Sequence, residues 1–266
     1  MKYDLDLGAG QGKRLGLIVL STDETLEWEV RGTLARHDVN LLHARIPARA
    51  DVTPEDLRSM APEMTRTAAL LPKDLSVVGY GCTSASALIG PDEVRRRIQE
   101  AHPGTPVTNP LSGVVAALQA LGATRVAMVT PYVKEVSVPM RDALAGHGIE
   151  VVNAVSFDQH EDWTVARITE ASTHAAMLEV GRAEGVQAIF TSCTNLRTFN
   201  AIEPVEEALG LPVVSSNQAL LWDMLRHANV DARGWGPGRL FDLSTTGGTA
   251  QGTIIQGETT LGDATE

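Results

Sequence analysis

Two cysteines, Cys82 and Cys193, are the residues of this chain best suited to chemistry. Each follows a short apolar run, residues 77–80 and 188–191, and each precedes a predicted helix. In open parallel sheets, ligands bind at the carboxyl ends of strands. Unpaired N–H groups and the positive end of a helix dipole collect there, so we expect a lowered thiol pKa and affinity for a carboxylate. Side-chain donors stand at both positions: Thr83, Ser84, Thr194 and Asn195.

Two opposed thiols suit the inversion or isomerisation of a carbon next to a carboxylate. One group must remove a proton while the other delivers a proton from the opposite face, and a thiolate and a thiol can exchange these roles. Alternatively, one thiolate adds to a double bond while the other manages protons. Neither scheme needs a metal or cofactor. The seven histidines show no spacing typical of a metal site. The glycine-rich segments 8–12 and 79–81 match a dinucleotide-binding motif only weakly. We therefore predict no cofactor and no metal.

Alternating strands and helices must position these cysteines. Short β-branched runs bounded by Gly, Pro or Asn/Asp are typical of buried parallel strands, and helix start and stop signals lie between them. The alternation predicts an α/β fold with mainly parallel sheets. The predicted strands cover residues 15–20, 39–46, 76–80, 125–129, 149–156, 187–191 and 212–214. The predicted helices cover residues 24–37, 54–71, 91–102, 111–121, 133–147, 163–184, 196–209 and 216–229.

The pattern runs twice along the chain. Each cysteine ends a strand, and each is followed at a similar interval by a Pro-Val run that ends in asparagine. We therefore expect two related αβα lobes. The first comprises residues 1–108 plus a returning helix within 216–235, and the second comprises residues 109–215. Residues 236–266 are rich in Gly and Thr, and we expect a flexible tail there.

Composition restricts the partners and the location. The formal net charge of −11 argues against binding to nucleic acid. No apolar run approaches the ~20 residues of a membrane-spanning helix, so no membrane association is expected. The first twelve residues lack the apolar core of a secretory signal, so we expect a cytoplasmic protein with reduced thiols.

The two cysteine motifs resemble a known superfamily. Residues 79–84 (Gly-Tyr-Gly-Cys-Thr-Ser) and 191–195 (Thr-Ser-Cys-Thr-Asn), with 130–133 (Thr-Pro-Tyr-Val), are similar to motifs of the aspartate/glutamate racemase superfamily. Within it, the chain looks most like the branch of maleate cis-trans isomerases, arylmalonate decarboxylases and ectoine-utilisation proteins. The resemblance implies pseudo-twofold lobes with the active site in the cleft between them, no cofactor, and a homodimer or higher homo-oligomer.

The resemblance also implies roles for single residues. Cys82 resembles the nucleophilic cysteine of the maleate isomerases, and Cys193 resembles the proton-handling cysteine. Tyr132 resembles the tyrosine that contacts a substrate carboxylate. The decarboxylases of this branch keep only the cysteine at the position of Cys193, so the presence of Cys82 argues against decarboxylation.

Two departures from the maleate isomerase pattern concern the substrate. Asp23 and Asp162 stand where that family places asparagines that hold a carboxylate. An aspartate only accepts hydrogen bonds and repels an anion, so a dianion such as maleate should bind poorly. A carboxylate that also carries positive charge, such as ectoine or its ring-opened products, should bind well. The Ser-Thr-Asp sequence at 21–23 resembles the ectoine-utilisation proteins, although Asp23 could instead cap the following helix.

Several alternatives stay open at this stage. The main hypothesis is a two-cysteine racemase or isomerase of ectoine or hydroxyectoine catabolism. Maleate isomerisation, a thiol oxidoreductase without a Cys-x-x-Cys pair, and a non-catalytic partner protein that keeps the pocket are the others. Ser216 and Asn217 could cap the last helix or face the pocket. The sequence does not decide the acid, the type of isomerisation or the subunit number.

Overall fold

Two parallel four-stranded sheets form the framework of the molecule. The structure is a computed structural model and describes residues 1–246. Both sheets have the same strand order, in which the first strand lies between the second and third. The first sheet, ordered β2-β1-β3-β4, contains β1 (Arg14–Leu20), β2 (Asn40–Ile46), β3 (Val77–Gly81) and β4 (Val107–Thr108). The second, ordered β6-β5-β7-β8, contains β5 (Arg125–Tyr132), β6 (Glu150–Gln159), β7 (Ala188–Thr191) and β8 (Val213–Ser215). The predicted α/β class is confirmed.

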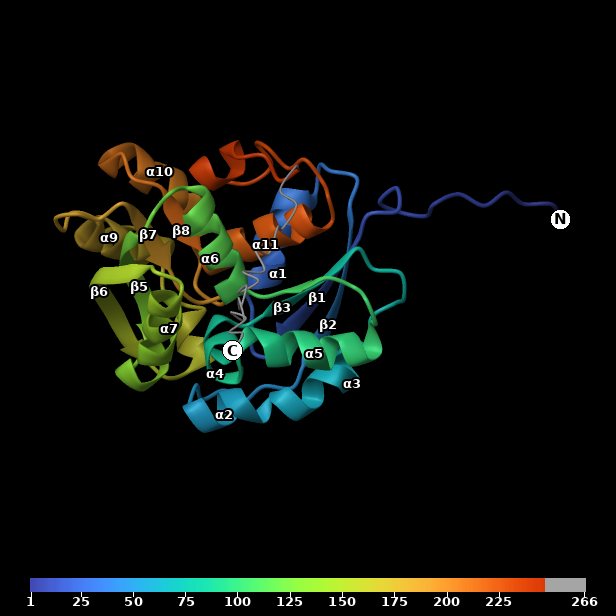
Figure 1. Ribbon diagram of the computed structural model, residues 1–266, viewed down its shortest axis with the longest axis horizontal. Helices are drawn as coiled ribbons and strands as arrows, with labels where there is room; N and C mark the ends of the chain where they lie inside the picture. Colours follow the sequence, from blue (N-terminus) through green and yellow to red (C-terminus); the bar gives the residue numbers. More distant parts are fainter. Residues whose placement is uncertain (247–266) are drawn as a thin grey trace, which may run out of the picture.

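Helices cover both faces of each sheet (Figure 1). In the first half of the chain they are α1 (Leu26–Leu34), α2 (Pro54–Ser59), the 3-10 helix η1 (Ala61–Glu63), α3 (Met64–Ala68), α4 (Thr83–Ile89), α5 (Pro91–Ala101) and α6 (Pro110–Ala120). In the second half they are α7 (Lys134–Gly146), α8 (Asp162–Val165), α9 (Glu170–Gly181), α10 (Phe199–Leu209), α11 (Ser216–His227) and the 3-10 helix η2 (Arg239–Asp242).

Two helices predicted as continuous are broken in the structure. The stretch 54–71 is interrupted by η1, which contains Pro62, because proline lacks an N–H and disfavours helical backbone in the residue before it. The stretch 163–184 stops after α8 and restarts at α9, where the Thr169 hydroxyl accepts a hydrogen bond from Ser172 N. Strand β4 was not predicted, since its two residues carry no periodicity.

Helices α6 and α11 pack against each other between the two sheets (Figure 1). A Cβ atom on Gly113 of α6 would lie 2.7 Å from the Ala219 carbonyl oxygen of α11, so glycine permits this close approach. One apolar core extends from β1 and β3 through both helices to β5 and β7. The division of the chain into lobes at residue 109, with 216–235 returning to the first lobe, stays a prediction.

The two glycines that precede Cys82 serve helix packing. A Cβ on Gly79 would lie 2.5 Å from Met224 Sδ of α11, and a Cβ on Gly81 would lie 2.3 Å from Leu26 Cδ2 of α1. Both positions are buried, so a side chain there would push a helix away from β3. These glycines therefore allow α1 and α11 to pack directly on the strand that carries Cys82.

The segment after α11 corrects the predicted start of the flexible tail. Residues 236–246 pack on the protein, with Leu240 and Phe241 fully buried. Gln218 Nε2 donates to Pro237 O at 2.7 Å, and Glu206 accepts from Arg239 N at 2.9 Å. The start at 236 is therefore wrong, because two apolar side chains suffice to anchor a segment without helical periodicity. The rest of the predicted tail, 247–266, lies outside the described residues. Within residues 1–246, no helix is both long and apolar enough to cross a bilayer.

Candidate active site

Both cysteines are buried at equivalent strand ends. Cys82 follows β3 and is the N-cap of α4, where its Sγ accepts a hydrogen bond from Ala85 N at 3.4 Å. Cys193 follows β7, and its Sγ accepts from Asn195 N at 3.2 Å. Their exposed fractions are 5% and 2%, and neither forms a disulfide. Cys193 has a φ of 111°, a backbone strain that surrounding contacts must maintain and that often marks a functional position.

Ser216 joins the two cysteine segments. Its Oγ accepts hydrogen bonds from Cys193 N at 3.0 Å and from Thr83 Oγ1, next to Cys82, at 2.8 Å. Thr194 Oγ1 also donates across, to Gly81 O at 3.4 Å. The two strand ends that the sequence places far apart therefore lie in one buried polar network.

Burial reverses the expected direction of the thiol pKa shifts. It raises the pKa of Cys82 to about 12 and that of Cys193 well above its usual value. The hydrogen bonds from Ala85 N and Asn195 N lower these pKa values only in part, while the carboxylates of Asp23 and Asp162 raise both further. The prediction of low thiol pKa values was wrong, because desolvation of the thiolate outweighs the backbone donors.

The two carboxylate oxygens of Asp23 differ in their hydrogen bonding. Oδ1 accepts from Thr25 N at 2.9 Å and Leu26 N at 2.8 Å, which caps the start of α1. Oδ2 is buried and has no hydrogen-bond partner among the described residues. Burial raises the pKa of Asp23, while the hydrogen bonds from Leu26 N and Thr25 N and the charge of Arg45 oppose the rise. The capping interpretation is therefore correct for one oxygen, while a substrate contact by the other stays a prediction.

Tyr132 connects Cys193 to Asp162. Its hydroxyl lies 2.9 Å from Cys193 Sγ and donates to Asp162 Oδ1 at 3.4 Å. Asp162 Oδ2 accepts from Thr22 Oγ1 at 2.5 Å. Burial raises the pKa of Asp162 to about 6, and the charge of Asp23 adds to the rise. The pairing of β5 with β6 shifts register just before Tyr132, and such irregularities re-aim side chains next to active sites.

The remaining predicted residues divide into two groups. Ser84 Oγ is buried without a hydrogen-bond partner among the described residues, so it is available to a ligand. The Asn195 amide is fully used: Nδ2 donates to Thr22 O and Asp162 O, and Oδ1 accepts from Glu24 N. The structure thus gives Asn195 a positioning contact where the sequence suggested a substrate contact, and the same holds for the hydroxyl of Thr83.

Glu29 of α1 is a buried residue that sequence reasoning missed. Its carboxylate accepts from Thr198 N at 2.7 Å, Phe199 N at 3.0 Å and Asn217 Nδ2 at 2.6 Å. Asn217 Nδ2 also donates to Thr194 O at 2.8 Å, so Glu29 supports the strained segment after Cys193. Only an unusual acidic residue on the apolar face of the predicted helix could have indicated it.

Burial raises the pKa of Glu29 from 4.5 to about 7, which predicts a pH-dependent stability. Because the folded pKa lies above the unfolded one, this group's stabilising contribution is complete at low pH and is lost as pH rises through 7. Between pH 5 and pH 8, wild type should lose about 2 to 3 kcal/mol of unfolding free energy relative to Glu29→Gln. Urea denaturation at both pH values measures this difference, and parallel pH profiles for the two proteins would contradict it.

Two loops, one after β2 and one after β6, pair with each other beside Asp162. Residues 50–52, after β2, and 160–162, after β6, form an antiparallel bridge that we call the interlobe bridge. Val52 N donates to His160 O at 2.7 Å, and Asp162 N donates to Ala50 O at 3.0 Å. The exposed side chains of Asp51, His160 and Glu161 lie near enough to share a cation, but no thiol belongs to this group.

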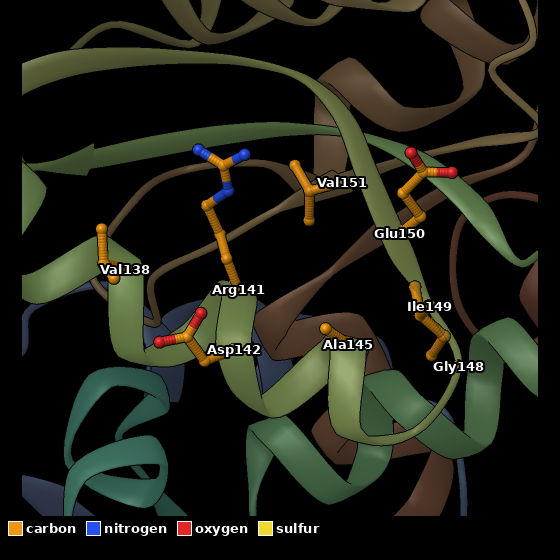
Figure 2. Close-up of a pocket in the computed structure, with 8 residues that line it drawn as sticks. All are labelled: Val138, Arg141, Asp142, Ala145, Gly148, Ile149, Glu150 and Val151. Atoms are coloured by element: carbon orange, nitrogen blue, oxygen red, sulfur yellow. The ribbon is translucent and has the colours of Figure 1, made fainter.

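The hollow drawn in Figure 2 lies elsewhere. It has a volume of about 510 Å³ and opens between α7 and the start of β6. Figure 2 shows Arg141 of α7 across from Glu150 and Val151, and neither cysteine lines the hollow. The thiols are buried and do not border this surface depression.

The fold and the site define a class: pseudo-twofold α/β proteins with a thiol at equivalent strand ends of two parallel sheets. The chain belongs to the arylmalonate decarboxylase family, whose model matches residues 42–241. This confirms the expected branch of the racemase superfamily, while the ectoine-utilisation type stays a prediction.

Individual relatives agree with this assignment. A maleate isomerase from Geobacillus stearothermophilus is 26% identical over 233 residues, which is 82% of this chain and 92% of the relative. An arylmalonate decarboxylase from Bordetella bronchiseptica is 35% identical over 143 residues, 53% of this chain and 60% of the relative. Among solved structures, the maleate isomerase of Pseudomonas putida S16 with maleate has a TM-score of 0.79 at 27% identity, covering 86% of this chain and 97% of that one.

Proposed function

We propose that this protein is a cofactor-independent two-cysteine racemase or isomerase for a small carboxylate that also carries a cationic group. Ectoine, hydroxyectoine and their ring-opened products have this chemistry, so we place the protein in the catabolism of such compounds. The observation that carries the proposal is the buried Asp23 Oδ2, which has no hydrogen-bond partner among the described residues. A cationic ligand group would supply that partner.

The arrangement of the site supports a proton-transfer reaction at a carbon next to a carboxylate. The charge of Asp23 raises the pKa of both thiols, so its carboxyl group belongs to the same buried cluster as Cys82 and Cys193. The free hydroxyl of Ser84, at the N-terminus of α4, offers a donor for the ligand carboxylate. With the cation on Asp23 and the carboxylate on Ser84, the carbon between them can exchange a proton with either thiol.

Maleate isomerisation is the alternative that the comparisons favour, since most of the similar curated proteins are maleate isomerases. Two observations oppose it. Asp23 and Asp162 both carry carboxyl groups in the site, and a dianion would meet repulsion of about 4 kcal/mol from each ionised group at ~4 Å. Raised pKa values relieve this only where the carboxyl groups become neutral.

Proton exchange in D₂O tests the proposal. Purified protein is incubated with ectoine, hydroxyectoine, their N-acetyl ring-opened products, maleate and aspartate. We expect deuterium at the α-carbon and a change of isomer only with the acids that carry a cationic or amide nitrogen. Conversion of maleate alone would support the alternative. No exchange and no conversion with any acid would support a non-catalytic partner protein that keeps the pocket.

We also propose a homodimer or higher homo-oligomer in the cytoplasm. The support is the family resemblance for the assembly and the two free thiols for a reducing compartment. Sedimentation analysis of the purified protein measures the subunit number, and a monomer would contradict this part of the proposal.

A further inference from the structure

A chain of contacts runs from the buried Cys193 thiol towards the surface. The Tyr132 hydroxyl lies 2.9 Å from Cys193 Sγ and donates to Asp162 Oδ1 at 3.4 Å. Asp162 begins α8, and its neighbours Glu161 and Trp163 are exposed. Cys82 has no such connection within residues 1–246, where its Sγ accepts a hydrogen bond from Ala85 N. The two thiols therefore differ in their access to a proton acceptor.

We propose that Cys193, Tyr132 and Asp162 form a proton relay. The relay removes the thiol proton of Cys193, so that the resulting thiolate can act as the base. The S–H bond of Cys193 breaks as its proton passes to Tyr132 Oη, and the Tyr132 O–H proton passes to Asp162 Oδ1. The products are a thiolate and a neutral carboxylic acid, so atoms and charge balance. The inference rests on the proposed function, since it assigns the proton path of the same site.

The relay solves a charge problem that the site itself creates. Asp162 lies close enough to raise the pKa of both thiols, so a thiolate formed by loss of a proton to water would add a second negative charge beside it. Transfer through Tyr132 moves the existing charge from Asp162 to Cys193 and leaves the total unchanged. The backbone N–H of Asn195, 3.2 Å from Cys193 Sγ, then stabilises the thiolate.

The main charges that act on the relay are acidic. Asp23 and Cys82 both disfavour additional negative charge there. His160 and Glu161 precede Asp162 in the chain, and both side chains are exposed. Thr22 Oγ1 donates to Asp162 Oδ2 and holds the carboxylate in place. The relay requires an ionised Asp162 before transfer, so thiolate formation should begin as pH rises through the pKa of that carboxyl group, about 6.

Alkylation of Cys193 tests the relay without substrate. Because the chain has two cysteines, the Cys82→Ser protein contains Cys193 as its sole thiol. In that background, the rate of modification by iodoacetamide is measured by mass spectrometry from pH 5 to pH 10. Tyr132 and Asp162 accept the thiol proton as the sulfur attacks the reagent, which makes the relay a general base in the alkylation step. We therefore expect Asp162→Asn and Tyr132→Phe each to lower the rate at pH 7 by ~10-fold or more, and to move the onset of reaction to higher pH.

The sign of the Asp162→Asn result is decisive. If Asp162 acted only through its charge, its removal would lower the pKa of Cys193 and accelerate alkylation. Unchanged or faster alkylation in Asp162→Asn, or an unchanged rate in Tyr132→Phe, would therefore overturn the relay.

Glu161→Gln provides the matched control, since it removes one negative charge from the exposed residue next to Asp162 and leaves the three groups of the relay unchanged. We expect this variant to retain the onset of reaction near pH 6. A loss in Glu161→Gln as large as that in Asp162→Asn would show that the relay does not cause the effect, and would also overturn the relay. Because no substrate is present, failure of the relay would be distinct from failure of the proposed function.

Discussion

Replacing Cys82 or Cys193 with serine is expected to abolish turnover, with a loss of roughly 10³-fold or more in kcat. In the proposed mechanism each thiol serves one face of the reacting carbon, so neither can replace the other. A serine hydroxyl is a much weaker acid and nucleophile than a thiol, although it keeps the size of the side chain. The measurement is conversion of the acid identified in D₂O, at equal protein concentration and at several pH values.

The fold should survive both substitutions. Serine is a good N-cap, so Cys82→Ser can still accept the hydrogen bond from Ala85 N that starts α4. Serine at 193 has the same Cβ and meets the same backbone strain at a φ of 111°. Thermal unfolding close to that of wild type is the control. Retained turnover in either folded variant would contradict a mechanism that needs two thiols.

Asp23→Asn is expected to reverse the preference between acids. Loss of the charge near a cationic group removes up to about 4 kcal/mol at ~4 Å, so kcat/KM for the cationic acid should fall by ~10²- to 10³-fold. For maleate the same change replaces repulsion with a donor, so its kcat/KM should rise. Asparagine Oδ1 can still cap α1, which confines the effect to the oxygen that lacks a partner.

Glu24→Gln supplies a matched control for charge. Glu24 is next to Asp23 in the chain, but its side chain is exposed and paired with Arg167 at 3.1 Å. The variant changes the net charge by the same amount and should leave the ratio of the two kcat/KM values unchanged. The experiment compares both acids with all three proteins, and an unaltered preference in Asp23→Asn would remove Asp23 from the substrate site.

Local sequence signals predicted the strand ends that carry the two cysteines and the presence of two parallel sheets. The strand ends that carry Cys82 and Cys193 were recognisable because apolar runs precede small polar residues and helices. The doubled pattern predicted the two parallel sheets, since alternation of strands and helices leaves few other topologies.

Properties that depend on distant contacts could not be predicted in this way. The pKa values of both thiols are set by burial under elements from the whole chain, which outweighs their helix-terminal positions. The contacts of Ser216 with Cys193 N and of Glu29 with Asn217 join residues far apart in sequence. Single polar residues of this kind have no periodicity, so only the folded structure identifies their partners.

The interlobe bridge has a consequence for the fate of a proton removed from the substrate. Residues 50–52 and 160–162 are paired and both thiols are almost completely buried, so in the proposed reaction the reacting carbon would be shielded from bulk water while the bridge is closed. A hydrogen captured by one cysteine in that reaction would return to the same carbon before the loops separate. Such internal return makes deuterium exchange with the solvent slower than breaking of the C–H bond. The rate of deuterium incorporation would then depend on the opening of the bridge as well as on the proton transfer.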